Sequence, residues 1–189
     1  TFSTEELAAI GSSAIKGLST GFIAALSTAE VAALSTAGVA GLTGDQINAL
    51  GRDQIEALST SQIAALSSAG LAGLTTEDLA TFSTGELAAI NSTAIRGLST
   101  AVVASLSPQE IAALTTSQVA ALSYGQVAAM GSAQIGALSL SQVSALNAMQ
   151  AAALGGDDLT TFSTEQIISL SSSAIFVMSA ETDLEDSVL

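Results

Sequence analysis

The chain has 189 residues with seventeen acidic and three basic side chains, which gives a net charge of −14 and excludes several functions at once. A chain this acidic repels phosphate backbones and anionic lipid surfaces, so we expect no binding to nucleic acid and no electrostatic docking to membranes. It also contains no Cys and no His. The usual nucleophile and base pairs are therefore missing, and we expect no enzyme activity and no catalytic residues.

From Ser3 to Met178 the sequence divides into twenty-two consecutive octads without an insertion or a deletion. The first position is Ser, Thr, Asn or Gly throughout, and Ser, Thr and Asn are preferred residues at helix N-caps. The fourth position is often Glu or Gln, which completes a capping box with the first. The fifth and eighth positions are aliphatic or aromatic in every octad except at Ala151. This period predicts one very short helix per octad.

The octad 107–114 is the clearest copy of this unit. Ser107 is a preferred N-cap, Glu110 stands three residues later, and Pro108 falls on the first helical position, where its missing N–H costs nothing. A shift of the frame by three or four residues would place this proline inside a helix and break it. Pro108 therefore sets the phase of all the octads.

A β-solenoid is the alternative fold, and a set of long helices is a third. In a strand the fifth and eighth positions would point to opposite faces, and in a long helix the apolar stripe would wind around the rod. A short helix places both positions on one face. Because such helices are unstable alone, they must stack. We therefore predict an all-α solenoid over residues 1–178, with one helix per octad.

A second period of eighty residues, or ten octads, lies above the first. Phe2, Phe82 and Phe162 recur at this spacing. Since ten is divisible by two and not by three, we predict about two helices per coil, with these rings on one side. Phe22 and Val102 are also equivalent across eighty residues, at a position that is normally polar.

Several aromatic or aliphatic residues, some of which break the octad pattern, are candidates for assembly or contact. They are Phe2, Phe22, Phe82, Val102, Tyr124 and Phe162. The segment 111–156 carries no charge and offers a possible assembly face. The Ser and Thr side chains at the first two positions form a regular ladder that could match ice, a mineral or a glycan. The plainer alternatives are that these hydroxyls cap helices and that the uncharged segment is ordinary solvent face.

Asp157 and Asp158, which follow Gly155 and Gly156, are a weak candidate for calcium, a cation that prefers oxygen ligands. Their simpler role is to place negative charge at a helix N-terminus. We expect no other cofactor. No apolar run approaches the ~20 residues that span a bilayer, so we expect no membrane insertion.

Residues 179–189 depart from the octad pattern and carry four acidic side chains, so we expect a polar terminal cap or a linker. The sequence starts at Thr1, and we expect that the chain is a processed protein or a fragment of a longer one.

The octads 27–34 and 115–122 resemble low-complexity arrays of Ser/Thr-x-Gln-Ile/Val-Ala-Ala-Leu in large exported bacterial surface and adhesin-like proteins. This resemblance implies an extracellular or cell-surface location. Together with the period, it predicts a rod-like spacer or a self-assembling filament whose partner is another copy or another surface component. The competing hypothesis is a binding module that presents the Ser/Thr ladder or a solenoid face to ice, mineral, glycan or peptide.

Overall fold

The computed structural model describes residues 2–170, so the octad 171–178 and the acidic segment 179–189 lie outside the described residues. Within 2–170 every regular element is a helix of three to six residues, and no strand is present there. The prediction of an all-α solenoid with one short helix per octad is confirmed.

The chain forms two compact units, which divide between Val102 and Val103. The helices of the first unit are α1 (Thr4–Ala8), α2 (Ser12–Ile15), α3 (Thr20–Ala24), α4 (Thr28–Ala33), α5 (Thr36–Gly41), α6 (Gly44–Asn48), α7 (Arg52–Glu56), α8 (Thr60–Ala65), α9 (Ser68–Leu71), α10 (Thr76–Leu79), α11 (Thr84–Ala89) and the 3-10 helix η1 (Ile95–Gly97). Helix α12 (Thr100–Ser105) contains the division. The second unit continues with α13 (Pro108–Ala113), α14 (Thr116–Ala121), α15 (Tyr124–Ala128), α16 (Ser132–Gly136), α17 (Leu140–Ser144), α18 (Ala148–Ala151), α19 (Gly156–Leu159) and α20 (Thr164–Ser169).

Each helix begins where the octad places its cap. In α13 the backbone N–H of Glu110 donates to Ser107 Oγ at 3.3 Å, and the Glu110 carboxylate accepts from the Ser107 N–H at 2.6 Å. Pro108 occupies the first turn, as predicted. Octad 91–98 differs because Asn91 Oδ1 accepts from the Thr93 N–H, two residues on, and this octad forms η1 in place of an α-helix.

The fifth and eighth positions of the octads form the core. Ile15, Ile47, Leu87 and Ile111 represent the fifth position, and all four side chains are fully buried. At the eighth position the described side chains from Leu26 to Leu154 are buried as well. The apolar pattern of the octad therefore predicts the core correctly.

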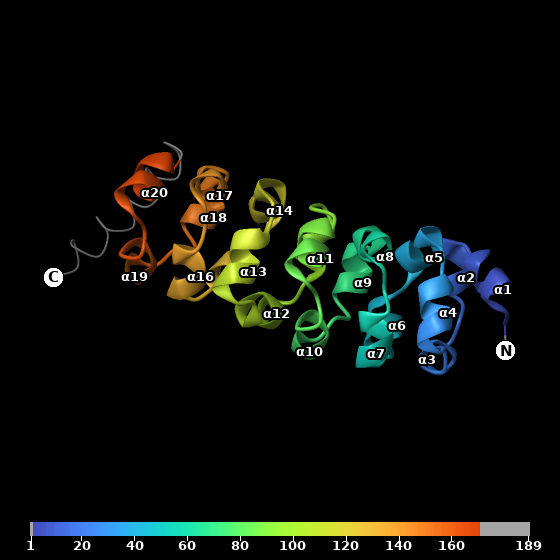
Figure 1. Ribbon diagram of the computed structural model, residues 1–189. Helices are drawn as coiled ribbons and strands as arrows, with labels where there is room; N and C mark the ends of the chain where they lie inside the picture. The colour runs from blue at the N-terminus through green and yellow to red at the C-terminus, as the bar shows by residue number, and fades with distance from the viewer. Residues whose placement is uncertain (1, 171–189) are drawn as a thin grey trace. The chain divides into compact units, whose positions relative to one another are not determined.

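The prediction of about two helices per coil is wrong, because each helix packs on the helix three octads away. The first unit contains three columns of stacked helices: α1–α4–α7–α10, α2–α5–α8–α11 and α3–α6–α9–η1. The second unit contains α13–α16–α19, α14–α17–α20 and α15–α18. Figure 1 shows α5, α8 and α11 following one another, and likewise α14, α17 and α20. One coil is therefore three octads.

The three-octad coil also corrects the predicted alignment of the phenylalanines. Ten octads are three coils plus one octad, so Phe2 and Phe82 in the first unit fall on different sides of the solenoid. The eighty-residue period is a repeat of the sequence and does not close a whole number of coils.

Glycines allow stacked helices to approach closely at some points in the first unit. A Cβ atom on Gly73 would lie 2.0 Å from the carbonyl oxygen of Gly44, and one on Gly97 would lie 2.0 Å from that of Ser68. No described glycine has a positive φ. These two glycines are therefore required by backbone contact between α6 and α9 and between α9 and η1, and not by an unusual conformation.

Candidate functional site

A recurrent interaction in both units is made by a glutamine at the fourth octad position, which joins successive coils. Gln62 Oε1 accepts from the backbone N–H of Ser59 at 2.8 Å, which completes the capping box of α8. Its Nε2 donates to the carbonyl oxygens of Val31 at 3.0 Å and Leu34 at 2.8 Å. The side chain is 3 % exposed. One amide therefore caps its own helix and binds the end of α4.

The same double role recurs along the chain, always between octads four apart. Gln46 Nε2 donates to Ile15 and Leu18, Gln54 to Ile23 and Leu26, Gln134 to Val103 and Leu106, Gln142 to Ile111 and Leu114, Gln150 to Val119 and Leu122, and Gln166 to Leu138. We call these glutamines, with Gln62, the glutamine ties. Their residues are buried, as are Gln118 and Gln126 at the same position of α14 and α15.

The chemistry of these contacts requires Gln and not Glu. The last carbonyl groups of a helix have no partner inside that helix, so a donor from elsewhere must satisfy them when they are buried. An amide offers both an acceptor for the cap and donors for the carbonyls, whereas an ionised carboxylate only accepts. Glu and Gln are interchangeable in a capping box, but only Gln can make a tie.

Glu side chains at the fourth position form the capping box but make no tie to an earlier coil. Glu30 accepts from the Ser27 N–H at 2.7 Å and from the Ser27 hydroxyl at 2.7 Å, and the residue is partly exposed. These hydrogen bonds, that of the backbone N–H first, lower the pKa of Glu30 below its ordinary value. The pKa of Glu6 is lowered by the same contacts from Ser3.

The ties are interrupted in six successive octads, where the fourth position carries Gly70, Asp78, Glu86, Ala94, Val102 and Glu110. None of these side chains can donate a hydrogen bond to a carbonyl at neutral pH. The division between the two compact units falls within this same stretch, after Val102. The first unit thus ends in octads that lack the tie.

In one octad without glutamine, a different side chain donates a hydrogen bond to a carbonyl oxygen of the earlier coil. In α5 the fourth position is Gly38, and a Cβ atom there would lie 2.9 Å from the carbonyl oxygen of Ile10. The hydroxyl of Ser35, the N-cap of α5, donates to that oxygen at 3.1 Å. The Ser35 hydroxyl therefore supplies the donor that a glutamine amide supplies elsewhere, and Gly38 leaves room for the carbonyl oxygen.

The predicted contact residues fall into two groups. Phe82, Val102 and Phe162 are buried, so they are not surface side chains, and a role for them in contacts stays a prediction. Phe2 is exposed and meets Phe22 edge-on, with ring centroids 5.5 Å apart. Tyr124 is 50 % exposed and remains a candidate.

Of the two predicted calcium residues, Asp158 is engaged in helix contacts. Asp158 accepts from the Gly155 N–H at 3.0 Å and from the hydroxyl of Ser132, on stacked helix α16, at 2.8 Å. Asp157 is exposed. Among the described residues no group of three or more His, Cys, Asp or Glu side chains is placed to hold a metal ion. Calcium binding here stays a prediction.

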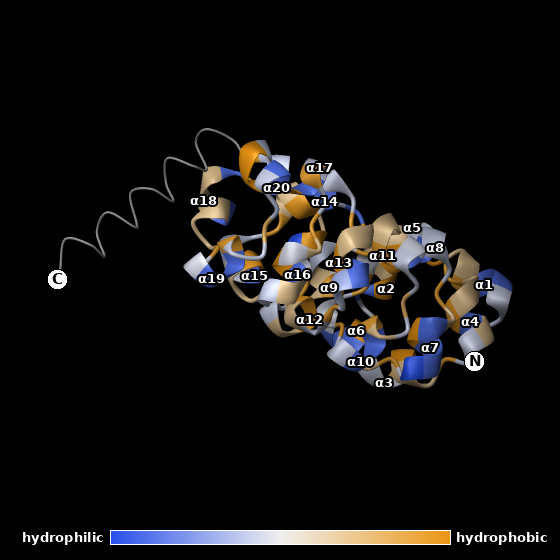
Figure 2. Ribbon diagram, turned by 60° about the vertical axis from the view of Figure 1, so that its left-hand side comes forward, coloured by the Kyte–Doolittle hydropathy of each residue, from blue (hydrophilic) through white to orange (hydrophobic). Residues whose placement is uncertain are grey.

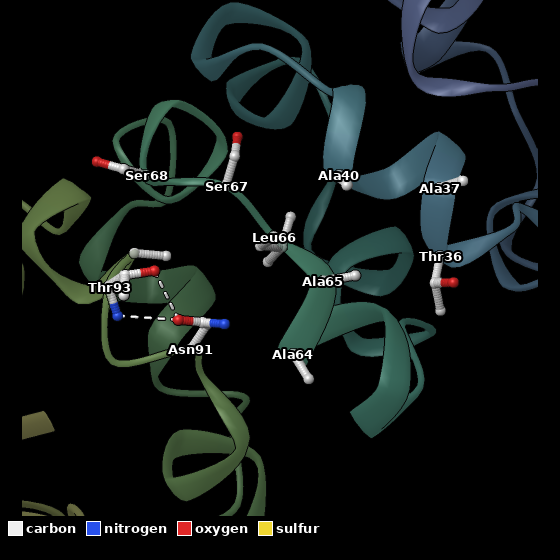
Figure 3. A pocket seen from close by; sticks show the side chains of 11 residues that line it. Thr36, Ala37, Ala40, Ala64, Ala65, Leu66, Ser67, Ser68, Asn91 and Thr93 are labelled. Carbon is white, nitrogen blue, oxygen red and sulfur yellow. Dashed lines mark hydrogen bonds between the residues drawn. The ribbon is translucent and has the colours of Figure 1, made fainter. Parts of the chain in front are cut away.

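A hollow of about 560 Å³ lies in the first unit between octads of α5, α8, α9 and η1. Figure 3 shows Thr36, Ala64, Ser67, Asn91 and Thr93 around it. Asn91 Oδ1 already accepts from Thr93, and Ser67 Oγ accepts from the Gly70 N–H. No residue that lines this hollow is titratable, so it offers no acid–base chemistry.

The predicted ladder of hydroxyls exists in one column of the first unit. The second octad position is exposed at Ser12, Thr36, Thr60 and Thr84, on the stacked helices α2, α5, α8 and α11. The hydroxyls at the first position are mostly used as caps, as Ser59 and Ser27 are. The ladder therefore consists of second-position side chains, one per coil.

Within residues 2–170 no helix is long and apolar enough to cross a membrane.

Searches of curated proteins and of solved structures returned no match. The family model described as the ALTTAQ repeat matches overlapping segments, namely residues 23–52, 52–84, 79–116, 87–124, 103–131, 111–148 and 119–156. These matches together cover more than half of the chain and confirm that it is a tandem repeat array. The chain belongs to the ALTTAQ repeat family.

Proposed function

We propose that this chain is a structural repeat segment, a rod-like spacer that can also assemble with further copies. The observation that carries the proposal is the glutamine tie, which joins octad to octad by the same two carbonyls in coil after coil. Each added coil creates the same interface as the one before it, so length is gained without new kinds of contact. The recurrent polar groups are largely occupied by caps and ties, which favours a structural role.

Small-angle scattering of the purified chain tests this proposal. We expect the rod-like intermediate regime of an elongated particle. Duplicating residues 43–66, one coil of three octads, should raise the maximum dimension by roughly 9–10 Å, the usual distance between packed helices. A matched insert with Ser at every fifth and eighth position cannot stack and should not give this increment. A compact particle, or equal behaviour of both inserts, would contradict the spacer.

We further propose that the segment belongs to an exported bacterial surface protein. The support is the resemblance of octads such as 27–34 and 115–122 to the arrays of such proteins. Protease treatment of intact producing cells tests the location. Cleavage of the repeat segment without cell lysis is expected, and protection until lysis would contradict it.

A binding module is the alternative, and the exposed ladder Ser12, Thr36, Thr60 and Thr84 favours it. In this case the ladder would bind a repetitive solid or a glycan. Thermal-hysteresis and polysaccharide pull-down measurements on the wild type and on a Thr36→Ala, Thr60→Ala variant separate the two functions. The spacer predicts no signal in either protein, whereas the binding module predicts a signal that the variant loses.

A further inference from the structure

The two eighty-residue blocks of the chain, 3–82 and 83–162, place nearly the same pair of octads in two different surroundings. Octads 3–18 open the first block and octads 83–98 open the second, and the two stretches carry identical residues at most positions. Both stretches lie in the first unit. Because their sequences match, a difference in burial between them reports the neighbours that each stretch has.

In the second block, an earlier coil of the same chain covers these octads. Helix α11 packs on α8 and η1 packs on α9, so octads 59–74 lie on the N-terminal side of octads 83–98. The side chains of Ile90, Ala94 and Leu98 are buried there. No tie joins the two layers, because the fourth positions carry Glu86 and Ala94. Two coils of this chain therefore stack without ties.

In the first block, the same octads have a neighbour on one side only. Among the described helices, α1 packs on α4 and α2 packs on α5, and none stacks on their N-terminal side. Figure 1 shows α1 and α2 at the end of the first unit where the N-terminus lies. Ile10 and Leu18 are half-buried and Ala14 is exposed, although their equivalents in the second block are buried.

Glycine at the seventh octad position gives independent evidence for a missing neighbour. In three later octads a Cβ atom at this position would overlap the backbone of the octad stacked before it. These are Gly41, Gly73 and Gly97, which lie against Ser12, Gly44 and Ser68. Gly17 stands at the same position, but a Cβ there would approach only the Ala14 carbonyl oxygen of its own octad, at 3.4 Å. Gly17 therefore leaves room for a backbone that the described part of the chain does not supply.

An exposed aromatic pair lies at the same end of the first unit. Phe2 is 43 % exposed, whereas its equivalent Phe82 is 6 % exposed. The ring of Phe2 meets that of Phe22 edge-on. Phe22 stands at the fourth octad position, from which the glutamine ties elsewhere reach an earlier coil. We define the N-terminal face as Phe2, Ile10, Ala14, Gly17, Leu18 and Phe22.

The equivalent octads identify what fits this face. Octads 83–98 are covered by a coil of the same repeat, so the N-terminal face is shaped for such a coil. The two ends of a coil differ, because fourth-position side chains face one way and the carbonyl groups that ties bind face the other. Two N-terminal faces therefore do not complement each other. The complement is the C-terminal end of the second unit of another copy, where the last described helices are α18, α19 and α20.

We propose that the N-terminal face is a docking site for the C-terminal end of a second copy of this chain. The copy takes the place that octads 59–74 take over octads 83–98. Contacts of this head-to-tail kind form rings or open filaments. No tie can form, since the fourth positions carry Glu6, Ala14 and Phe22. This inference rests on the assembly part of the proposed function and names its surface, and the spacer does not depend on it.

Sedimentation velocity of the full chain between about 1 and 100 μM tests the proposal, because association depends on protomer concentration. The test variant is Gly17→Gln, which fills the space for the neighbouring backbone without adding charge or an apolar surface. We expect the wild type to form oligomers that grow with concentration. The variant should associate at least about tenfold more weakly, because overpacking a close contact holds the surfaces apart. The control Gly85→Gln, at an exposed position of α11, should sediment as the wild type does.

Salt gives a second readout of the same contact. Glu5 and Glu6 lie beside the N-terminal face, and Asp157 and Asp158 lie near the C-terminal end of the second unit. Figure 2 shows hydrophilic residues on α1. These like charges repel, so raising NaCl from about 50 to 500 mM should strengthen the association. An association that weakens with salt contradicts the proposal.

An extended chain tests the face apart from its partner. Residues 59–80 placed before Thr1 continue the octad frame, because Thr1 and Phe2 repeat Thr81 and Phe82. In this chain Gly17 lies under a coil as Gly97 does. Gly17→Gln should therefore lower the melting temperature of the extended chain and leave that of the original chain, measured as a monomer, unchanged. The same change in both chains contradicts a stacking face.

Circular dichroism of each variant must show the same helix content, so that a loss of association is not a loss of fold. A wild type that stays monomeric throughout, or a Gly17→Gln variant that associates equally well, overturns the proposal. A monomeric wild type whose extended chain shows the expected loss of stability overturns it in favour of a coil from a different chain. Scattering of the monomeric Gly17→Gln variant remains rod-like if the spacer holds, so the two proposals fail separately.

Discussion

The Nε2 atom of Gln62 donates to the carbonyl oxygen of Leu34, twenty-eight residues earlier, at 2.8 Å. The same amide caps its own helix through Oε1. This pairing of a local and a distant hydrogen bond in one side chain links the start of an octad to the end of the fourth octad before it. Three of the predictions below concern the contacts between coils, and the fourth concerns caps alone.

Gln62→Glu should destabilise the chain by roughly 1–3 kcal/mol, because the cap survives while the buried carbonyls of Val31 and Leu34 face a carboxylate without a donor. Urea denaturation followed by circular dichroism measures the loss. Acidification should restore part of the difference from the wild type, since a protonated carboxyl regains one donor. Equal stability of the two proteins at neutral pH would contradict the role of the tie.

Glu86→Gln should stabilise the first unit by about 0.5–1.5 kcal/mol, because octad 83–90 lies four octads after 51–58 and the new amide can reach the carbonyls of Ile55 and Leu58. The matched control is Glu30→Gln, because the structure describes no octad four units before 27–34. Denaturation midpoints of both variants check the prediction. If Glu30→Gln raises the denaturation midpoint as much as Glu86→Gln does, the added stability does not come from a new tie.

Gly73→Ala should cost roughly 1–3 kcal/mol, since the added Cβ would lie 2.0 Å from the backbone oxygen of Gly44 and the stacked helices must move apart. Gly21→Ala is the control, because no atom lies within 4 Å of a Cβ there and Ala favours the helix. We expect the control to melt at or above the wild-type temperature. If Gly73→Ala also melts at or above the wild-type temperature, the close contact does not constrain the packing of the helices.

Acid should weaken the caps of Glu6 and Glu30. Hydrogen bonds from Ser3 and Ser27 lower the pKa of these carboxyls in the folded chain. The caps therefore contribute stability that is present above the unfolded pKa and is lost as the pH falls through the folded pKa. The melting temperature of the variant Glu6→Gln, Glu30→Gln should fall less than that of the wild type between pH 7 and pH 3. If the melting temperatures of the variant and the wild type fall equally with pH, these carboxyls do not contribute to stability.

Comparison of the two blocks finds surface residues that the octad pattern alone missed. Leu140 and Met149 stand at positions where the octad tolerates any small or polar residue, so neither disturbs the core pattern. Their signal is their difference from Thr60 and Ala69, eighty residues earlier. Conversely, Phe82 and Val102 differ from their octad neighbours but are buried, because an eighth-position ring and a fourth-position aliphatic residue can both face the core.

The sequence by itself determined the local structure of this protein. Caps such as Ser107, the proline at 108 and the aliphatic residues at positions five and eight act within one octad, so their spacing predicts where each helix starts and which face it buries. The number of helices per coil was decided only by the tertiary structure, because all three columns use the same octad and no residue type marks a column. The hydrogen bond from the Nε2 of each glutamine tie to the earlier coil also could not be predicted from the sequence. Its partner is a backbone carbonyl, which every residue has, and only the stacking of coils brings that carbonyl within reach.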